Sequence, residues 1–134
     1  MSESLCFLSA TELADAIRHK RVSPVDITSA VLARAERLQP ELNCFITIDA
    51  ERAMESACQA ERLVMAGGPL GLLHGVPFTV KDIVNTQGVR TTFGAAPLRD
   101  NVPQQDAVAV ARLREQGAIL IGKTTTPEFG SKCL

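Results

Sequence analysis

A lysine inside a short run of β-forming residues is the first feature of this sequence that could do chemistry. The run covers residues 78–84 and follows a turn signal made by Gly75 and Pro77. In a strand, side chains alternate between the two faces, so Lys81 and Asp82 would point apart and would not pair automatically. A lysine among apolar neighbours without a carboxylate is pushed towards its neutral form, and a neutral lysine is a base. The alternative interpretation places Lys81 near a strand end with its ammonium group in water.

The cysteines and histidines do not predict a metal site. The sequence has no C-x-x-C pair, and neither His19 nor His74 stands at a metal-ligand spacing from the cysteines, which are Cys6, Cys44, Cys58 and Cys133. The glycines at 67–71 do not match the dinucleotide fingerprint G-x-G-x-x-G. We therefore expect no metal and no cofactor.

Composition excludes several classes of function. Basic residues number 14 against 15 acidic residues, and there is no Trp or Tyr, so neither an electrostatic grip on nucleic acid nor a base-stacking platform is indicated. No apolar run approaches the ~18 residues of a membrane span, and the N-terminus lacks the pattern of a signal peptide. We expect no membrane association and a cytoplasmic location, where cysteines stay reduced.

Two helices are predicted before the first strand. Ser9 with Glu12 forms a capping box that opens the first helix. Ser23 and Pro24 start the second helix as its N-cap and first helical residue, and Pro40 is expected to lie past its end.

A strand and a third helix follow. Alternating side chains predict a short strand over 44–48. Asp49 is expected to cap the third helix, whose small inner residues allow close packing and which Gly67 can terminate.

The second half of the chain has the pattern of a βαβ unit. The strand over 78–84 precedes a helix over 107–116, which Asp106 is expected to cap, and then an apolar strand over 118–121. Such a crossover gives a parallel pair of strands. Residues 122–129 would then form a loop at the carboxyl end of the last strand, the place where ligands usually bind in open α/β sheets. The predicted class is α/β, with N-terminal helices followed by the first strands of a mixed sheet flanked by helices.

The second half also resembles the amidase signature family. The matching pieces occur in the family's order and spacing, and they are Leu73-His74-Gly75-Val76-Pro77, Val80-Lys81-Asp82, Gly88 with Thr91, Thr92 and Gly94, Asp106-Ala107, Val110, Arg112-Leu113, Gly117-Ala118, Gly122-Lys123-Thr124 and Pro127-Glu128-Phe129. The helical first half is similar to the family's N-terminal helices. The resemblance implies that residues 1–134 are the N-terminal part of a single domain with an incomplete amidase signature fold, in which 1–72 are mainly helical and 73–134 begin the core.

The resemblance implies an enzyme that hydrolyses the carbon–nitrogen bond of a small-molecule carboxamide. The family uses a Ser–cis-Ser–Lys unit without a cofactor, in which one serine attacks the carbonyl carbon and a neutral lysine receives the proton. By this resemblance Lys81 is the catalytic lysine. Thr91, Thr92 and Gly94 resemble the family segment that packs beside the active site, with no catalytic role carried over.

The serines depart from the family pattern. The family's catalytic serines follow the position matching Phe129 in a Gly- and Ser-rich segment, and none of the serines here lies in that context: Ser2, Ser4, Ser9, Ser23, Ser29, Ser56 and Ser131. We expect residues 1–134 to be an N-terminal piece of an amidohydrolase that is inactive alone. The alternatives are a fragment of the A subunit of a glutamine-dependent tRNA amidotransferase, or a non-catalytic module that binds a partner. Bare sheet edges also predict self-association.

Overall fold

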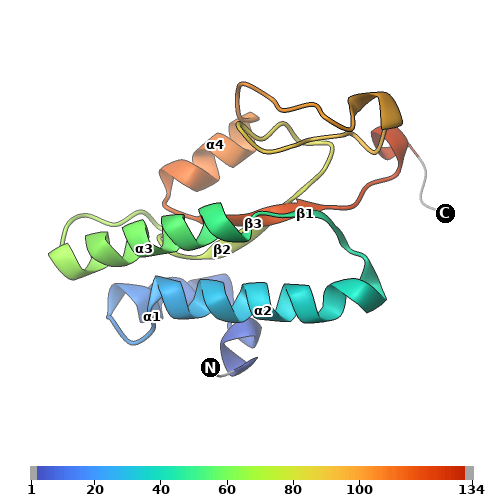
Figure 1. The fold of residues 1–134 in the computed structure, drawn as a ribbon. Coiled ribbons are helices and arrows are strands. Elements are labelled where there is room, and N and C mark those ends of the chain that lie inside the picture. Colours follow the sequence, from blue (N-terminus) through green and yellow to red (C-terminus); the bar gives the residue numbers. More distant parts are fainter. Residues whose placement is uncertain (1–2, 132–134) are drawn as a thin grey trace.

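A computed structural model describes residues 3–131, and its helices lie on both faces of a small sheet (Figure 1). The elements are α1 (Ala10–Arg18), α2 (Pro24–Leu42), β1 (Phe45–Ile48), α3 (Ala50–Ala66), β2 (Pro77–Lys81), α4 (Val108–Glu115) and β3 (Ile119–Thr124), with a short 3₁₀ helix at Glu3–Phe7. The predicted α/β class is confirmed. Within 3–131 no helix is both long and apolar enough to cross a membrane.

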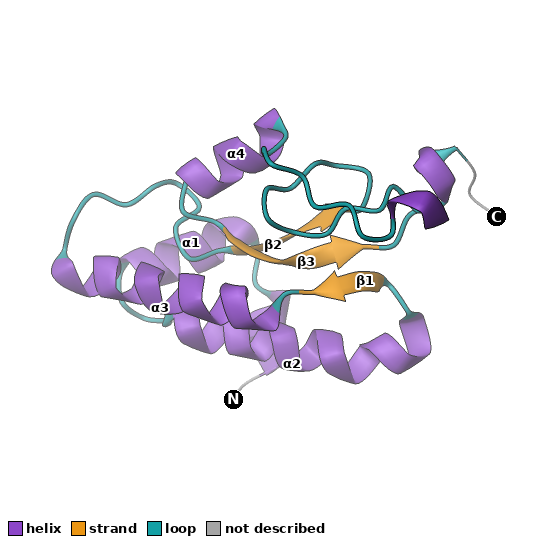
Figure 2. Ribbon diagram, turned by 45° about the horizontal axis from the view of Figure 1, so that its top comes forward, coloured by secondary structure: helices purple, strands orange, loops and turns teal. Residues whose placement is uncertain are grey.

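The sheet is mixed and has the strand order β1-β3-β2. β2 and β3 are parallel, as the predicted crossover through α4 requires, whereas β1 pairs with β3 in the antiparallel sense. Helices α1 to α3 lie on one side of the sheet, and α4 and the long loop after β2 lie on the other (Figure 2). The sheet therefore forms the middle layer of the molecule.

The two predicted helix starts are confirmed. Ser9 and Glu12 make both bonds of the capping box, and the Ser23 hydroxyl accepts from the first-turn amides of α2. Pro40 does not lie past the end of α2, as expected, but inside its last turn. A proline this close to the end removes one helical hydrogen bond, and α2 instead ends at Asn43, which has a left-handed backbone.

Small residues bring α3 close to its neighbours. Ala53, Ala57 and Ala60 are buried against Leu32 of α2 and Ile121 of β3. Asp49 occupies the predicted N-cap position without making a capping bond, because its carboxylate pairs with Arg52. Gly67 ends the helix with φ +73°, as predicted.

Two strand boundaries differ from the prediction. The strand expected over 78–84 covers Pro77–Lys81 and then turns, and the strand expected over 118–121 extends to Thr124. Between the Phe78–Leu120 and Thr79–Gly122 pairs, β3 contains one extra residue, a β-bulge. Residues 122–124 are therefore strand rather than loop, and the bulge re-aims Lys123 onto the same face as its partner Val80.

Candidate active site

Lys81 is the last residue of β2, and its side chain is exposed. Its Nζ donates to the carbonyl oxygen of Thr125 at 3.3 Å. The predicted alternation is confirmed, because Asp82 is fully buried while its neighbour is not. The sequence allowed two environments for Lys81, an apolar one or a strand end near water. The structure has the second, because Lys81 is exposed at the end of β2. Within residues 3–131 it forms no ion pair.

The residues after Lys81 form a closed loop over 82–93, which we call the Asp82 loop. One carboxylate oxygen of Asp82 accepts from the backbone amide of Thr92 at 3.0 Å and from the Thr92 hydroxyl. The backbone amide of Phe93 donates to the Asp82 carbonyl at 2.9 Å, so the two ends of the loop are tied together. The other carboxylate oxygen of Asp82 is buried without a hydrogen-bond partner among the described residues.

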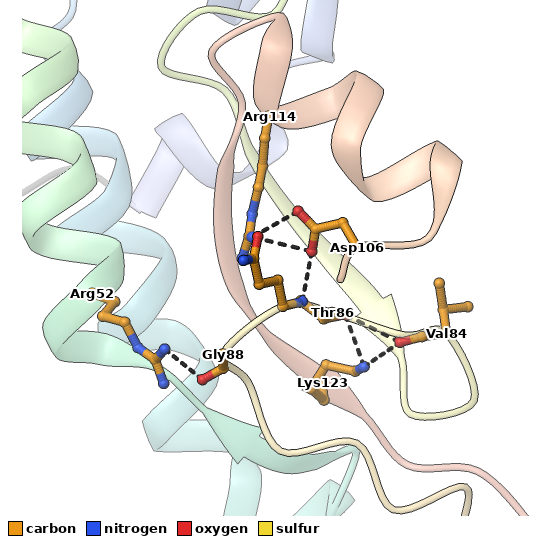
Figure 3. Close-up of polar contacts among 8 residues, drawn as sticks. Arg52, Val84, Thr86, Gly88, Asp106, Arg114 and Lys123 are labelled. Carbon is orange, nitrogen blue, oxygen red and sulfur yellow. Dashed lines mark hydrogen bonds and ion pairs between the residues drawn. The ribbon is translucent and has the colours of Figure 1, made fainter. Parts of the chain in front are cut away.

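Lys123 lies inside this loop and is fully buried (Figure 3). Its Nζ donates to the Val84 carbonyl at 2.6 Å, to the Thr91 hydroxyl at 2.8 Å and to the Thr86 hydroxyl at 3.0 Å. Both hydroxyls donate their own hydrogens to backbone carbonyls at 3.1 Å. The three acceptors therefore need three N–H groups, which only the ammonium form supplies.

Burial makes that ammonium group costly. It lowers the pKa of Lys123 from 10.5 to about 8, and the charges of Asp82 and Asp106 oppose the shift. Lys123 and Lys81 are also separated by the sheet, because Val80 pairs with Lys123 and the following residue, Lys81, points to the other face. The two lysines thus have different environments, since Lys123 is buried and Lys81 is exposed.

Further polar contacts fix the Asp82 loop and the segment after it (Figure 3). Asp106 accepts from the Gln87 amide at 2.7 Å and from Arg114 of α4 at 2.8 Å. Arg52 of α3 donates to the Gly88 carbonyl at 2.6 Å. The expected capping role of Asp106 is wrong, since Ala107 is the N-cap of α4 and the Asp106 carboxylate binds the loop instead.

The threonines and glycine that matched the family segment take structural positions within and just after the Asp82 loop. Thr91 binds Lys123 and Thr92 binds Asp82, and both are buried. Gly94 has φ +67°, and a Cβ atom there would lie 2.7 Å from the Thr126 carbonyl oxygen. Only glycine permits this approach of two backbones.

The structure shows two buried charged residues, Asp82 and Lys123, to which sequence reasoning gave no role. Lys123 was placed in a loop, and its acceptors lie 32 to 39 positions earlier in the chain, so no local pattern could predict its burial. The β-forming threonines that begin at Thr124 were the available signal that the strand continues past Ile121. Within residues 3–131 no group of histidines, cysteines and acids could hold a metal, and Cys6, Cys44 and Cys58 are free thiols. Cys133 lies outside the described residues.

The sequence pattern of the Amidase family matches residues 26–133. This chain belongs to the amidase family. An acylamidase of Rhodococcus erythropolis is 41% identical over 128 residues, which are 96% of this chain and 27% of the relative. The A subunit of the glutamyl-tRNA(Gln) amidotransferase of Geotalea daltonii is 42% identical over 122 residues, 91% of this chain and 25% of the relative.

A solved bacterial aryl acylamidase of the amidase signature family has the same arrangement of elements. It superposes with a TM-score of 0.86 at 27% identity, over 91% of this chain and 26% of its own. The amidase chain described here therefore spans about a quarter of the length of the relatives it matches. Its mixed sheet and helices correspond to part of the amidase signature fold.

Proposed function

We propose that this chain is the lysine-bearing N-terminal part of a single amidase domain, and that Lys81 is the catalytic base. The parent enzyme would hydrolyse a small-molecule carboxamide to a carboxylate and ammonia. The observation that carries the proposal is the position of Lys81 in an amidase-family chain, exposed at the carboxyl end of a parallel strand. Ligands of α/β sheets usually bind at such strand ends.

The backbone around Lys81 is held firmly enough to position a base. The amide of the next residue, Asp82, donates to the Thr124 carbonyl at 3.0 Å, and the Val84 amide donates to the Lys81 carbonyl at 3.0 Å. Lysine can take a proton from a serine hydroxyl only when its amine is neutral. In the parent, a covering segment would supply the dry surroundings that favour the neutral amine.

Four of the described serines support the proposal that residues 1–134 are inactive alone. Ser9 and Ser23 cap helices, Ser56 donates to the Arg52 carbonyl at 2.8 Å, and Ser131 donates to the Glu128 carbonyl at 2.9 Å. Ser23 also donates to the Glu61 carboxylate at 2.5 Å, and none of these four hydroxyls binds Lys81. A nucleophile for the amide carbonyl, and donors for the oxyanion, would come from the family's downstream Ser-rich segment.

A second candidate is part of the A subunit of a glutamine-dependent amidotransferase. The supporting observation is the identity of 42% to the corresponding subunit of the glutamyl-tRNA(Gln) amidotransferase of Geotalea daltonii. The base would be the same lysine, with glutamine as the amide that releases ammonia. For either candidate we propose a cytoplasmic enzyme, supported by the free thiols at Cys6, Cys44 and Cys58.

The test compares two proteins, residues 1–134 and the product of the reading frame extended past Leu134. Each is incubated with aliphatic and aromatic amides and with glutamine, and ammonia is measured. We expect no ammonia from residues 1–134 and turnover from the extended protein. Preference for glutamine over the other amides would favour the amidotransferase candidate.

Two results would contradict the proposal. Ammonia release by residues 1–134 that disappears in Lys81→Ala would show that the chain contains a complete catalytic route. An extended protein without amidase or glutaminase activity would contradict the proposed function itself, and it would favour a non-catalytic module.

A further inference from the structure

The ammonium group of Lys123 donates three hydrogen bonds, and all three go to the segment that follows Lys81. The acceptors are the Val84 carbonyl oxygen at 2.6 Å, the Thr91 hydroxyl at 2.8 Å and the Thr86 hydroxyl at 3.0 Å. These acceptors belong to the Asp82 loop, whereas the lysine itself belongs to β3. Lys123 therefore connects the central strand of the sheet to the loop that begins directly after the proposed base.

Val84 lies in the tight turn that ends β2. Its amide donates to the Lys81 carbonyl at 3.0 Å, which closes a β-turn over residues 81–84. Val84 thus holds the Lys81 backbone through its N–H and binds the Lys123 ammonium through its carbonyl. The position of Lys81 consequently depends on how this turn is anchored.

The end of β3 also holds Lys81 directly. The Lys81 Nζ donates to the Thr125 carbonyl at 3.3 Å, and the amide of the next residue, Asp82, donates to the Thr124 carbonyl at 3.0 Å. Lys123, Thr124 and Thr125 are consecutive in the chain. One short segment therefore fixes the Lys81 amine, the backbone after Lys81 and the turn that follows.

Stability alone is a weak reason for a charge at the Lys123 position. A buried ammonium group loses its hydration, and apolar replacements of buried charged groups are often neutral or stabilising. An ammonium group can, however, bind three acceptors in fixed directions at once, which an apolar side chain cannot do. We propose that Lys123 is a positioning residue for Lys81 and acts through the 81–84 turn. The inference rests on the role proposed for Lys81, and it gives Lys123 no contact with the substrate.

Loss of the Lys123 ammonium should act on the chemical step. A base must lie within about 3 Å of the proton that it removes, and a misplacement of about 1 Å can lower the rate by about 10²-fold. Without Lys123 the Val84 carbonyl loses its charged donor, so the turn can shift and carry Lys81 with it. We therefore expect a lower kcat and a nearly unchanged KM.

The first test is kinetic and uses the extended protein described under the proposed function. Lys123→Met should lower kcat by about 10- to 100-fold per folded molecule. Thr91→Val removes one of the three acceptors and should lower kcat by less, whereas Thr91→Ser keeps the hydroxyl and should recover most of the loss. These two variants decide the question if Lys123→Met does not fold. Ser9→Ala, at the N-cap of α1 on the other side of the sheet, is the control that changes stability without changing kcat.

The second test is hydrogen exchange, measured by mass spectrometry on the same extended proteins. In Lys123→Met the peptide covering residues 82–93 should exchange faster by a larger factor than a peptide from α2. Loss of a merely stabilising residue would speed exchange in both peptides alike, because both would open through global unfolding. This readout does not depend on catalytic activity.

The outcomes separate this inference from the proposed function. Inactivity of the native extended protein would refute the function proposed for Lys81. An active native protein whose kcat is unchanged in folded Lys123→Met, or in both Thr91 variants if Lys123→Met does not fold, would refute only the positioning role. Equal changes in exchange of the two peptides would also refute that role.

Discussion

The Lys123→Met variant should lose a pH dependence of stability that the native chain has. The pKa of Lys123 falls from 10.5 to about 8 in the fold because its ammonium group is buried. Between those two values the unfolded chain holds a proton that the native state has released, so the free energy of unfolding rises with pH. Methionine has a similar length and no titrating group, and it leaves the other ionisable groups of the chain in place.

The size of the effect follows from the shift. At 1.36 kcal/mol for each pKa unit, the native chain should gain about 3 kcal/mol relative to Lys123→Met between pH 7 and pH 10.5. With a urea m-value of about 1.5–2 kcal/mol/M, the difference between the two unfolding midpoints should change by about 2 M.

The assay is urea unfolding at low protein concentration, with a thiol reductant present, repeated at several values of pH for both proteins. The comparison cancels cysteines and exposed lysines that also titrate in this range. A constant difference between the two midpoints from pH 7 to pH 10.5 would refute the buried-charge description of Lys123.

Three further substitutions test the packing and the polar contacts by chemical unfolding. Gly122→Ala places a Cβ atom 2.2 Å from the Thr47 carbonyl oxygen, so it should destabilise the β1–β3 pairing by about 1–3 kcal/mol or prevent folding; stability equal to that of the native chain would contradict the close approach. Ser9→Ala removes the N-cap of α1 and should cost about 1 kcal/mol, and an unchanged unfolding midpoint would show that the capping box contributes nothing. Asp106→Ala leaves the Gln87 amide and Arg114 without their acceptor and should lower the free energy of unfolding by about 1–3 kcal/mol. The control is Asp100→Ala at an exposed site, which should have no measurable effect. Equal stability of the two variants would contradict the anchoring of the Asp82 loop by Asp106.

Local sequence signals predicted the helix starts and the crossover well. Ser9 with Glu12, and Ser23 with Pro24, act on the backbone within a few residues, so their effect can be read without the rest of the fold. The parallel pairing of β2 with β3 followed from the strand–helix–strand pattern, because a helical crossover returns the chain to the end of the sheet where the first strand began. The prediction for Pro40 was wrong because the helix continues past it. Proline removes only one helical hydrogen bond, and the Asn43 amide still donates to the Gln39 carbonyl at the end of α2.

Sequence reasoning predicted the position of Lys81 but not the contacts of Lys123 and Asp106. Lys81 stands in a recognisable pattern, and its exposure follows from strand alternation and the early end of β2. Lys123 depends on a β-bulge and on acceptors in a distant loop, and Asp106 binds that loop rather than its own helix. Such long-range contacts between polar groups leave no periodic signal in the sequence.

The central claim, that Lys81 is the base of an amidase, is tested most directly in a chimera. The N-terminal quarter of the Rhodococcus erythropolis acylamidase, to which this chain is 41% identical, is replaced by residues 1–134. Acyl-amide hydrolysis is then compared for the unsubstituted chimera, Lys81→Ala, Lys81→Arg and the exposed control Lys20→Ala. We predict that both Lys81 variants fold but lose at least about 10²-fold in kcat, because alanine has no amine and arginine stays charged, while Lys20→Ala keeps full activity. Turnover by folded Lys81→Ala equal to that of the unsubstituted chimera would contradict the assignment of Lys81 as the base.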